Sequence, residues 1–200
     1  IGVATDIHAP AAPIMSFLAA QRPLVVLFGD SITQQSFSPH GWGAAIADAV
    51  QGRADVVNRG FSGYNTRWLR ARLDSLFPPQ PARKELLLTT VFLGANDAAI
   101  EEHSGQHVPV AEYRENLTAI VERLRSHSEH VLLFTPPPVD GEKFAATRPW
   151  PNAPVSRRDE VVAQYAAAAL DVARSLGCAV VDVRAHLLGA EPTRWSEEFL

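Results

Sequence analysis

Short runs of apolar residues alternate along this chain with segments whose apolar positions recur at helical spacing. The runs cover residues 24–28, 54–57, 86–93, 131–134 and 178–183. They are continuous and not alternating, which is typical of strands that are covered on both faces. Helical segments over 42–51 and 66–77 follow the first two runs. The order of elements therefore predicts a parallel five-stranded sheet between two layers of helices, an α/β/α sandwich.

Two longer helices complete the pattern. The first places five apolar side chains on one face: Tyr113, Leu117, Ile120, Val121 and Leu124. The second is expected to begin at a capping box formed by Ser156 and Asp159 and to end at Gly177. Residues 136–155 lie between them and are rich in proline, so we expect an irregular surface loop near the mouth of a site.

Polar residues gather where the predicted strands end, and sites in parallel sheets lie beyond those carboxyl ends. The first strand runs into Gly29-Asp30-Ser31. A small hydroxyl residue there suits a nucleophile, and its main-chain N–H could face an oxyanion. The alternative is that Ser31 caps a helix. We expect Asp30 to hold the turn and not to act as an acid or base.

The next two strand ends offer possible oxyanion donors. The loop "NRGFSGYNT" over 58–66 contains Gly63, whose N–H could donate, although such glycines often only form turns. "FLGAND" over 92–97 presents Asn96, whose amide stays neutral at every working pH. Its alternative role is an Asx-turn. Each signal is weak alone, but the three occur in order at successive strand ends.

Composition and charge limit which kinds of protein this chain can be. The 200 residues, 46% hydrophobic and 20% charged, fit one folded α/β domain. A net charge of −4 argues against nucleic acid as a partner. No run approaches the roughly 18 apolar residues of a membrane span, and without a convincing signal peptide a cytoplasmic location is the default expectation. The single cysteine, Cys178, lies in an apolar run and is expected to be a small buried residue.

These motifs resemble the conserved blocks of the SGNH, or GDSL-type, hydrolases. The matching segments over residues 24–200 include "FGDSITQQSF", "NRGFSGYNTRW", "FLGANDA" and "TPPPVD", and they are most similar to the isoamyl acetate-hydrolysing esterase branch. The resemblance implies a flavodoxin-like fold and a hydrolase domain over residues 21–200, preceded by an N-terminal extension over 1–20.

The resemblance also implies a mechanism. Ser31 matches the nucleophile, and the Ser31 N–H, the Gly63 N–H and the Asn96 amide match the oxyanion hole. The reaction would pass through an acyl-enzyme on a small-molecule carboxylic ester, with small acetyl esters expected. No metal or organic cofactor is implied, and nothing in the sequence indicates an oligomeric state.

The general base is missing from the matched positions. The family's Asp-x-x-His block follows "W…FL", whereas here "RWSEEFL" ends the chain at Leu200. A serine without a base is a weak nucleophile. We therefore expect a fragment of a longer protein. The alternatives are that His186, four residues after Asp182, substitutes for the base, or that the chain is a relative that binds without turnover.

Other candidates carry weaker signals. His103 and His107 have a spacing that could suit a metal, but Gly105 lies between them and solvated loop residues are expected. His127 and His130 fit a helix end. Three aromatic residues near the site blocks could line an acyl or alcohol pocket, or pack in the core: Phe37, Trp42 and Trp68. Rival functions are a carbohydrate acetylesterase, a thioesterase, or a binding protein with a decayed site.

Overall fold

The computed structural model describes residues 22–78, 84–149 and 152–189. The expected N-terminal extension over 1–20 and the "RWSEEFL" segment over 194–200 lie outside the described residues. None of the helices in the described ranges is both long enough and apolar enough to cross a bilayer.

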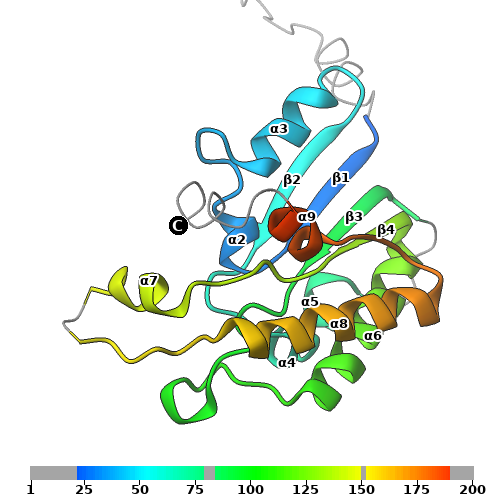
Figure 1. Ribbon diagram of the computed structural model, residues 1–200. Coiled ribbons are helices and arrows are strands. Elements are labelled where there is room, and N and C mark those ends of the chain that lie inside the picture. The colour runs from blue at the N-terminus through cyan, green and yellow to red at the C-terminus, as the bar shows by residue number, and fades with distance from the viewer. Residues whose placement is uncertain (1–21, 79–83, 150–151, 190–200) are drawn as a thin grey trace, which may run out of the picture.

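The sheet has the predicted strands in parallel, in the order β2-β1-β3-β4-β5 (Figure 1). The strands are β1 (Leu24–Gly29), β2 (Asp55–Gly60), β3 (Leu86–Phe92), β4 (Ser128–Phe134) and β5 (Ala179–Val181). The apolar runs in β1 and β3 are buried along most of their length, as their continuity predicts. This confirms the flavodoxin-like α/β expectation. β5 is an edge strand, and Val181 is exposed.

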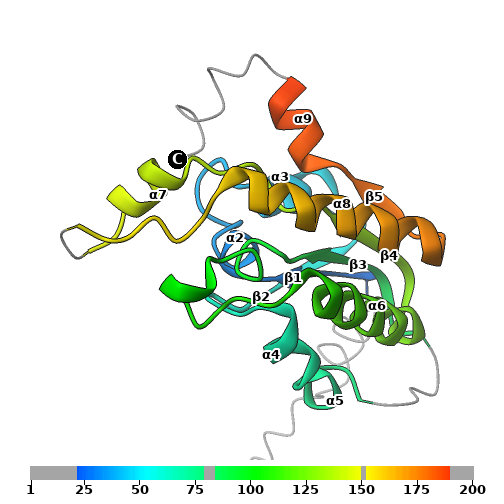
Figure 2. The same ribbon diagram turned by 60° about the horizontal axis from the view of Figure 1, so that its bottom comes forward.

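Helices cover both faces of this sheet (Figure 2). In chain order they are α2 (Ser31–Gln34), α3 (Trp42–Ala49), α4 (Thr66–Arg70), α5 (Leu73–Leu76), the 3-10 turn η1 (Glu101–His103), α6 (Val110–His127), α7 (Gly141–Ala146), α8 (Asp159–Leu176) and α9 (Val183–Gly189). The main core lies between one face of the sheet and α4, α5, α6 and α8. α6 and α9 lie on opposite sides of the strands (Figure 2).

The apolar face of α6 was predicted correctly. Tyr113, Leu117 and Ile120 are at most 1% exposed, and the Tyr113 hydroxyl donates to the Leu93 carbonyl at 3.1 Å. Gly177 ends α8 in the left-handed conformation with φ +57°, also as predicted. The long helical faces therefore pack as their periodicity indicates.

Three predictions of local structure were wrong. The helix over 66–77 breaks into α4 and α5, with Ala71 and Arg72 between them. Residues 136–155 include the helix α7, which is capped by Asp140 through a bond from the Lys143 N–H at 3.0 Å. The capping box does not form, because Arg158 precedes the first residue of α8, Asp159.

Candidate active site

A tight turn delivers Ser31 from the end of β1 to the start of α2. A Cβ on Gly29 would lie 2.2 Å from Thr33 Oγ1 and 2.5 Å from the Phe92 carbonyl oxygen, so only glycine fits there. Asp30 caps α2, since its Oδ1 accepts a bond from the Ile32 N–H at 2.9 Å. Asp30 therefore holds the turn as expected.

Ser31 is the first residue of α2, so the prediction that it serves as the helix cap was wrong. Its N–H is one of the donors that a helix start leaves without an intrahelical acceptor. Among the described residues, neither this N–H nor the Ser31 hydroxyl has a hydrogen-bond partner. Both groups are therefore available to a ligand.

Gly63 lies in the loop that follows β2. Its φ is +81°, a left-handed conformation that favours glycine. The Gln106 side-chain Nε2 donates to the Gly63 carbonyl at 2.7 Å, which anchors this flexible position. Within the described part of the chain, the Gly63 N–H has no acceptor. The residue does form a turn, but its N–H remains free.

Asn96 follows the end of β3 and is 8% exposed. Its Nδ2 donates to the Tyr64 carbonyl at 2.9 Å, and its Oδ1 accepts from Arg157 Nη2 at 3.1 Å. These contacts replace the Asx-turn that was the alternative prediction. They use only one of the two hydrogens on Nδ2, so the amide can still donate to a ligand.

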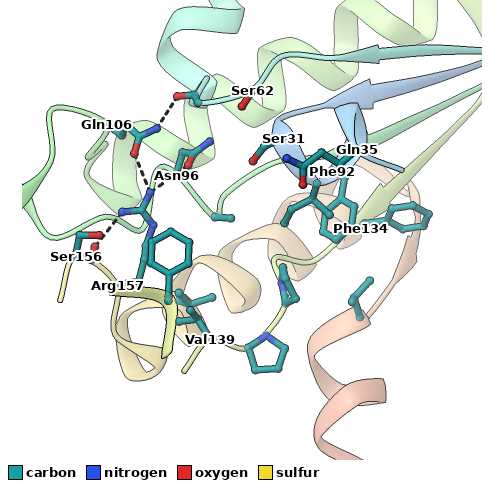
Figure 3. Close-up of a pocket in the computed structure, with 18 of the residues that line it drawn as sticks. Ser31, Gln35, Ser62, Phe92, Asn96, Gln106, Phe134, Val139, Ser156 and Arg157 are labelled. Carbon is teal, nitrogen blue, oxygen red and sulfur yellow. Dashed lines mark hydrogen bonds between the residues drawn. The ribbon is translucent and has the colours of Figure 1, made fainter. Parts of the chain in front are cut away.

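One cavity, with a volume of about 1020 Å³ within the described part of the chain, is lined by Ser31, Gly63 and Asn96. In Figure 3, Ser31 lies between Asn96 on one side and Gln35 and Phe92 on the other. The structure thus brings together the three predicted residues, which are separated by 32 and 33 positions in the sequence.

The cavity has an apolar wall and a polar wall. On the apolar side, the Trp42 ring meets Phe92 and Phe134 edge-on, with ring centroids 5.9 and 5.3 Å apart. On the polar side lie Gln106 and Arg157 (Figure 3). Among the described residues that line the cavity, no aspartate or glutamate is present. The cavity therefore has an aromatic surface on one side of Ser31 and polar side chains on the other.

Two buried carboxyl groups lie close to the turn that carries Ser31 and to the end of β3. Burial raises the pKa of Asp30 to about 7 and that of Asp97 to about 6, in each case from an ordinary value of 3.8. Asp97 accepts a bond from the Thr66 N–H at 3.0 Å, which ties the end of β3 to the start of α4. Burial, followed by the charge of Arg148, lowers the pKa of Arg157 to about 10.

Residues 27–200 match the GDSL-like Lipase/Acylhydrolase family. The chain belongs to this family. It is 44% identical over 165 residues to the isoamyl acetate-hydrolyzing esterase 1 homolog of Mus musculus, an alignment that covers 80% of this chain and 66% of the mouse protein. It is 40% identical over 188 residues to a GDSL esterase/lipase of Arabidopsis thaliana, covering 90% of this chain and 76% of the plant protein. The chain thus spans just under two thirds of the length of the mouse relative.

Solved structures of GDSL-type proteins share the fold. A lipase/acylhydrolase from Enterococcus faecalis superposes with a TM-score of 0.64 at 25% identity, covering 89% of this chain and 83% of that one. An acetylxylan esterase from Geobacillus stearothermophilus gives a TM-score of 0.59 at 22% identity, covering 82% and 78% of the two chains. This second likeness supports the fold alone.

The candidate base His186 does not reach the cavity. α9 turns Val183 and Leu187 toward the cavity and leaves His186 exposed. Asp182 instead caps α9, because its Oδ1 accepts from the Ala185 N–H at 3.0 Å. The Asp182 and His186 pair is therefore not a substitute for the family's acid and base in this arrangement.

The other histidines differ in position. His103 is exposed but lines the cavity, a role that the sequence did not indicate. His107 Nδ1 lies 2.7 Å from the Ala99 carbonyl and is partly buried. Over residues 22–78, 84–149 and 152–189, no cluster of three or more His, Cys, Asp or Glu side chains could hold a metal ion. Cys178 is only partly buried, and its Sγ donates to the Val131 carbonyl at 3.1 Å.

Of the three aromatic residues singled out from the sequence, Trp42 lines the cavity, and Phe37 and Trp68 are 45% and 40% exposed. Two residues on the polar wall, Gln106 and Arg157, were not indicated by any pattern in the sequence. Arg157 stands beside Arg158 in "SRRDE", and no local pattern distinguishes the buried arginine from the exposed one. Only the folded chain brings Arg157 to Asn96.

Proposed function

We propose that this protein is a serine esterase that hydrolyses carboxylic esters through an acyl-enzyme on Ser31. The observation that carries the proposal is that Ser31, Gly63 and Asn96 line one cavity at the ends of three neighbouring strands. The free N–H groups of Ser31 and Gly63 and the remaining Nδ2 hydrogen of Asn96 supply neutral donors, as an oxyanion requires.

The chemistry follows from these groups. The Ser31 Oγ attacks the ester carbonyl carbon, and the carbonyl oxygen becomes an oxyanion held by the three donors. The alcohol then leaves with a proton, and the acyl group remains on Ser31. Water attacks the acyl-enzyme, releases the acid and returns the proton to Ser31. Each oxyanion donor contributes a factor of roughly 10²–10³ to the rate.

The attacking hydroxyl needs a base, and we propose that it comes from outside the described residues. Among the described residues no side chain accepts a bond from the Ser31 hydroxyl. His103 lines the same cavity but is exposed, and His186 points away from it. This chain aligns with only 66% of the mouse relative. The activity of the whole protein is therefore a part of this proposal and is not taken from that relative.

Small acetyl esters are the proposed substrates. The relatives named as isoamyl acetate-hydrolyzing esterase 1 homologs support this class, and the aromatic wall formed by Trp42, Phe92 and Phe134 suits a short branched alcohol such as isoamyl alcohol. Carbohydrate acetyl esters are the second candidate, since the acetylxylan esterase of Geobacillus stearothermophilus shares the fold. Comparing isoamyl acetate with acetylated xylose as substrates separates the two.

The test compares two serines that line the same cavity. Ser31→Ala should abolish both the covalent adduct with a fluorophosphonate probe and the hydrolysis of p-nitrophenyl acetate. Ser62→Ala is the matched control and should retain both, because Ser62 lines the same cavity as Ser31 (Figure 3) but is not the proposed nucleophile. Imidazole is added in parallel assays as an external base. A wild-type chain that neither forms the adduct nor hydrolyses the ester would favour a binding protein.

A further inference from the structure

Arg157 places a buried guanidinium on the polar wall of the cavity, in contact with the proposed oxyanion donor Asn96. Arg157 is 5% exposed. Its Nη2 donates both to Asn96 Oδ1 at 3.1 Å and to Gln106 Oε1 at 2.8 Å, and its Nη1 donates to the Ser156 carbonyl at 2.9 Å (Figure 3). The ring of Phe144 lies 5.4 Å from the guanidinium carbon.

The contact with Asn96 fixes which end of the carboxamide faces the cavity. In the observed orientation, Oδ1 faces the guanidinium and Nδ2 faces the Tyr64 carbonyl. A flipped amide would place Nδ2 against the cation of Arg157 and Oδ1 against the Tyr64 carbonyl, so both contacts would become repulsive. Accepting a bond from a charged donor also polarises the amide, which strengthens its remaining N–H as a donor.

Gln106 connects Arg157 to the backbone of Gly63 by two hydrogen bonds. Its Oε1 accepts from Arg157 at 2.8 Å, and its Nε2 donates to the Gly63 carbonyl at 2.7 Å. Gly63 has a φ of +81° and, as a glycine, wide conformational freedom. Anchoring its carbonyl restrains the backbone that aims its N–H. Arg157 therefore connects with both separate oxyanion donors, directly to one and through Gln106 to the other.

The burial of this charge is not explained by an ion pair. Within the described residues, Arg157 forms no salt bridge with a carboxylate, and its side-chain donors are directed to neutral oxygens. Asp30 and Asp97 act on it only through longer-range attraction. A buried charge without a paired carboxylate is unfavourable for stability, and such arrangements cluster at functional sites.

We propose that Arg157 is a positioning residue which, together with Gln106, holds the Asn96 amide and the Gly63 peptide in the orientation that the oxyanion requires. This inference rests on the proposed function of Ser31. It assigns to Arg157 no contact with the substrate and no proton transfer. Its effect should therefore appear in the rate of the covalent step and not in the binding of the probe.

The test measures covalent labelling of Ser31 by a fluorophosphonate, with the maximal rate and the half-saturating concentration determined separately. The variants are Arg157→Met, Asn96→Ala, the double variant and Gln106→Ala. Arg158→Ala is the matched control, because it removes the same charge from the exposed neighbouring position. Circular dichroism and thermal unfolding verify that each variant folds.

We expect Asn96→Ala to slow the maximal rate by about 10²–10³-fold and Arg157→Met by about 10–10²-fold, with the half-saturating concentration nearly unchanged. The double variant should be within about threefold of Asn96→Ala, because Arg157 acts mainly through that residue. Gln106→Ala should slow labelling because it removes the bond that holds the Gly63 carbonyl. If Arg157→Met does not fold, Gln106→Ala replaces it as the test of the inference. Arg158→Ala should label like the wild type.

Two results would overturn the inference alone. The first is labelling of Arg157→Met at the wild-type rate, or of Gln106→Ala at that rate if Arg157→Met does not fold. The second is a loss of rate in the double variant equal to the product of the two single losses, as expected for independent residues. A wild-type chain that is not labelled at Ser31 would overturn the proposed function and the inference together. The two failures are therefore distinguishable in one set of measurements.

Discussion

Replacing Asp30 by asparagine should raise the stability of the protein at pH 8 and flatten its dependence on pH. Asp30 is 1% exposed, and burial raises its pKa to about 7. Its Oδ1 accepts a bond from the Ile32 N–H, which an asparagine oxygen can accept equally well. The substitution therefore keeps the cap of α2 and removes the ionisable proton.

The size of the effect follows from proton linkage. Because the pKa of Asp30 rises from 3.8 in the unfolded chain to about 7 in the folded protein, the folded state binds more protons between these values, and stability falls as pH rises. Between pH 5 and 8, the free energy of unfolding should fall by about 2–3 kcal/mol from Asp30 and about 1 kcal/mol from Asp97. Groups with lowered pKa values, such as Glu112 and Asp159, are ionised in both states above about pH 6 and add little.

The assay is urea denaturation of the wild type and Asp30→Asn at intervals from pH 5 to 8. The wild type should lose about 3–4 kcal/mol over this range and Asp30→Asn about 1 kcal/mol or less, since removing the charge of Asp30 also eases the ionisation of Asp97. Asp48→Asn, at an exposed site, makes the same change of formal charge and should follow the wild-type curve. All three proteins have the same histidines, so the titration of histidine changes their stability equally. If the free energy of unfolding falls with pH in parallel for the wild type and Asp30→Asn, the reasoning is refuted.

Three further predictions concern single side chains. Asn96→Ala should lower ester turnover by about 10²–10³-fold, and wild-type-like kcat in that variant would contradict its role in the oxyanion hole. In Gly63→Ala the new Cβ makes only an ordinary contact, 3.6 Å from Gln106 Nε2, but alanine is forced into a φ of +81°, so a stability loss of about 1 kcal/mol in urea denaturation and a larger loss in turnover are expected. Tyr113→Phe removes the buried bond to the Leu93 carbonyl and should cost about 1–3 kcal/mol of stability without changing KM.

The sheet and the positions of Ser31, Gly63 and Asn96 at one cavity could be predicted from the sequence because their signals are local. The runs that became β1 and β3 are continuous and apolar, and each ends directly before a glycine-containing turn that carries Ser31 or Asn96. Sites in parallel sheets lie at those ends, so finding the strands was sufficient to place the residues. The flavodoxin-like type of the fold was implied by the family resemblance, and the order of the strands is a finding of the structure.

The capping box was predicted wrongly because tertiary contacts use one of the groups that it requires, the Asp159 carboxylate. The Asp159 carboxylate accepts from the Val139 N–H at 3.0 Å and from Arg184 at 2.6 Å. Val139 and Arg184 both lie outside the four-residue motif, so the pattern alone could not reveal that the Asp159 carboxylate is engaged elsewhere.

The strand order also constrains where a general base can act. β1 lies between β2 and β3, and the proposed oxyanion donors Gly63 and Asn96 follow those two neighbours. The proton of an attacking hydroxyl must leave on a side that the oxyanion does not occupy. In Figure 3, the side of Ser31 away from Asn96 carries Gln35, Phe92 and Phe134. We therefore expect an imidazole base to approach against this aromatic wall, where desolvation lowers its pKa and favours the neutral form that accepts the proton.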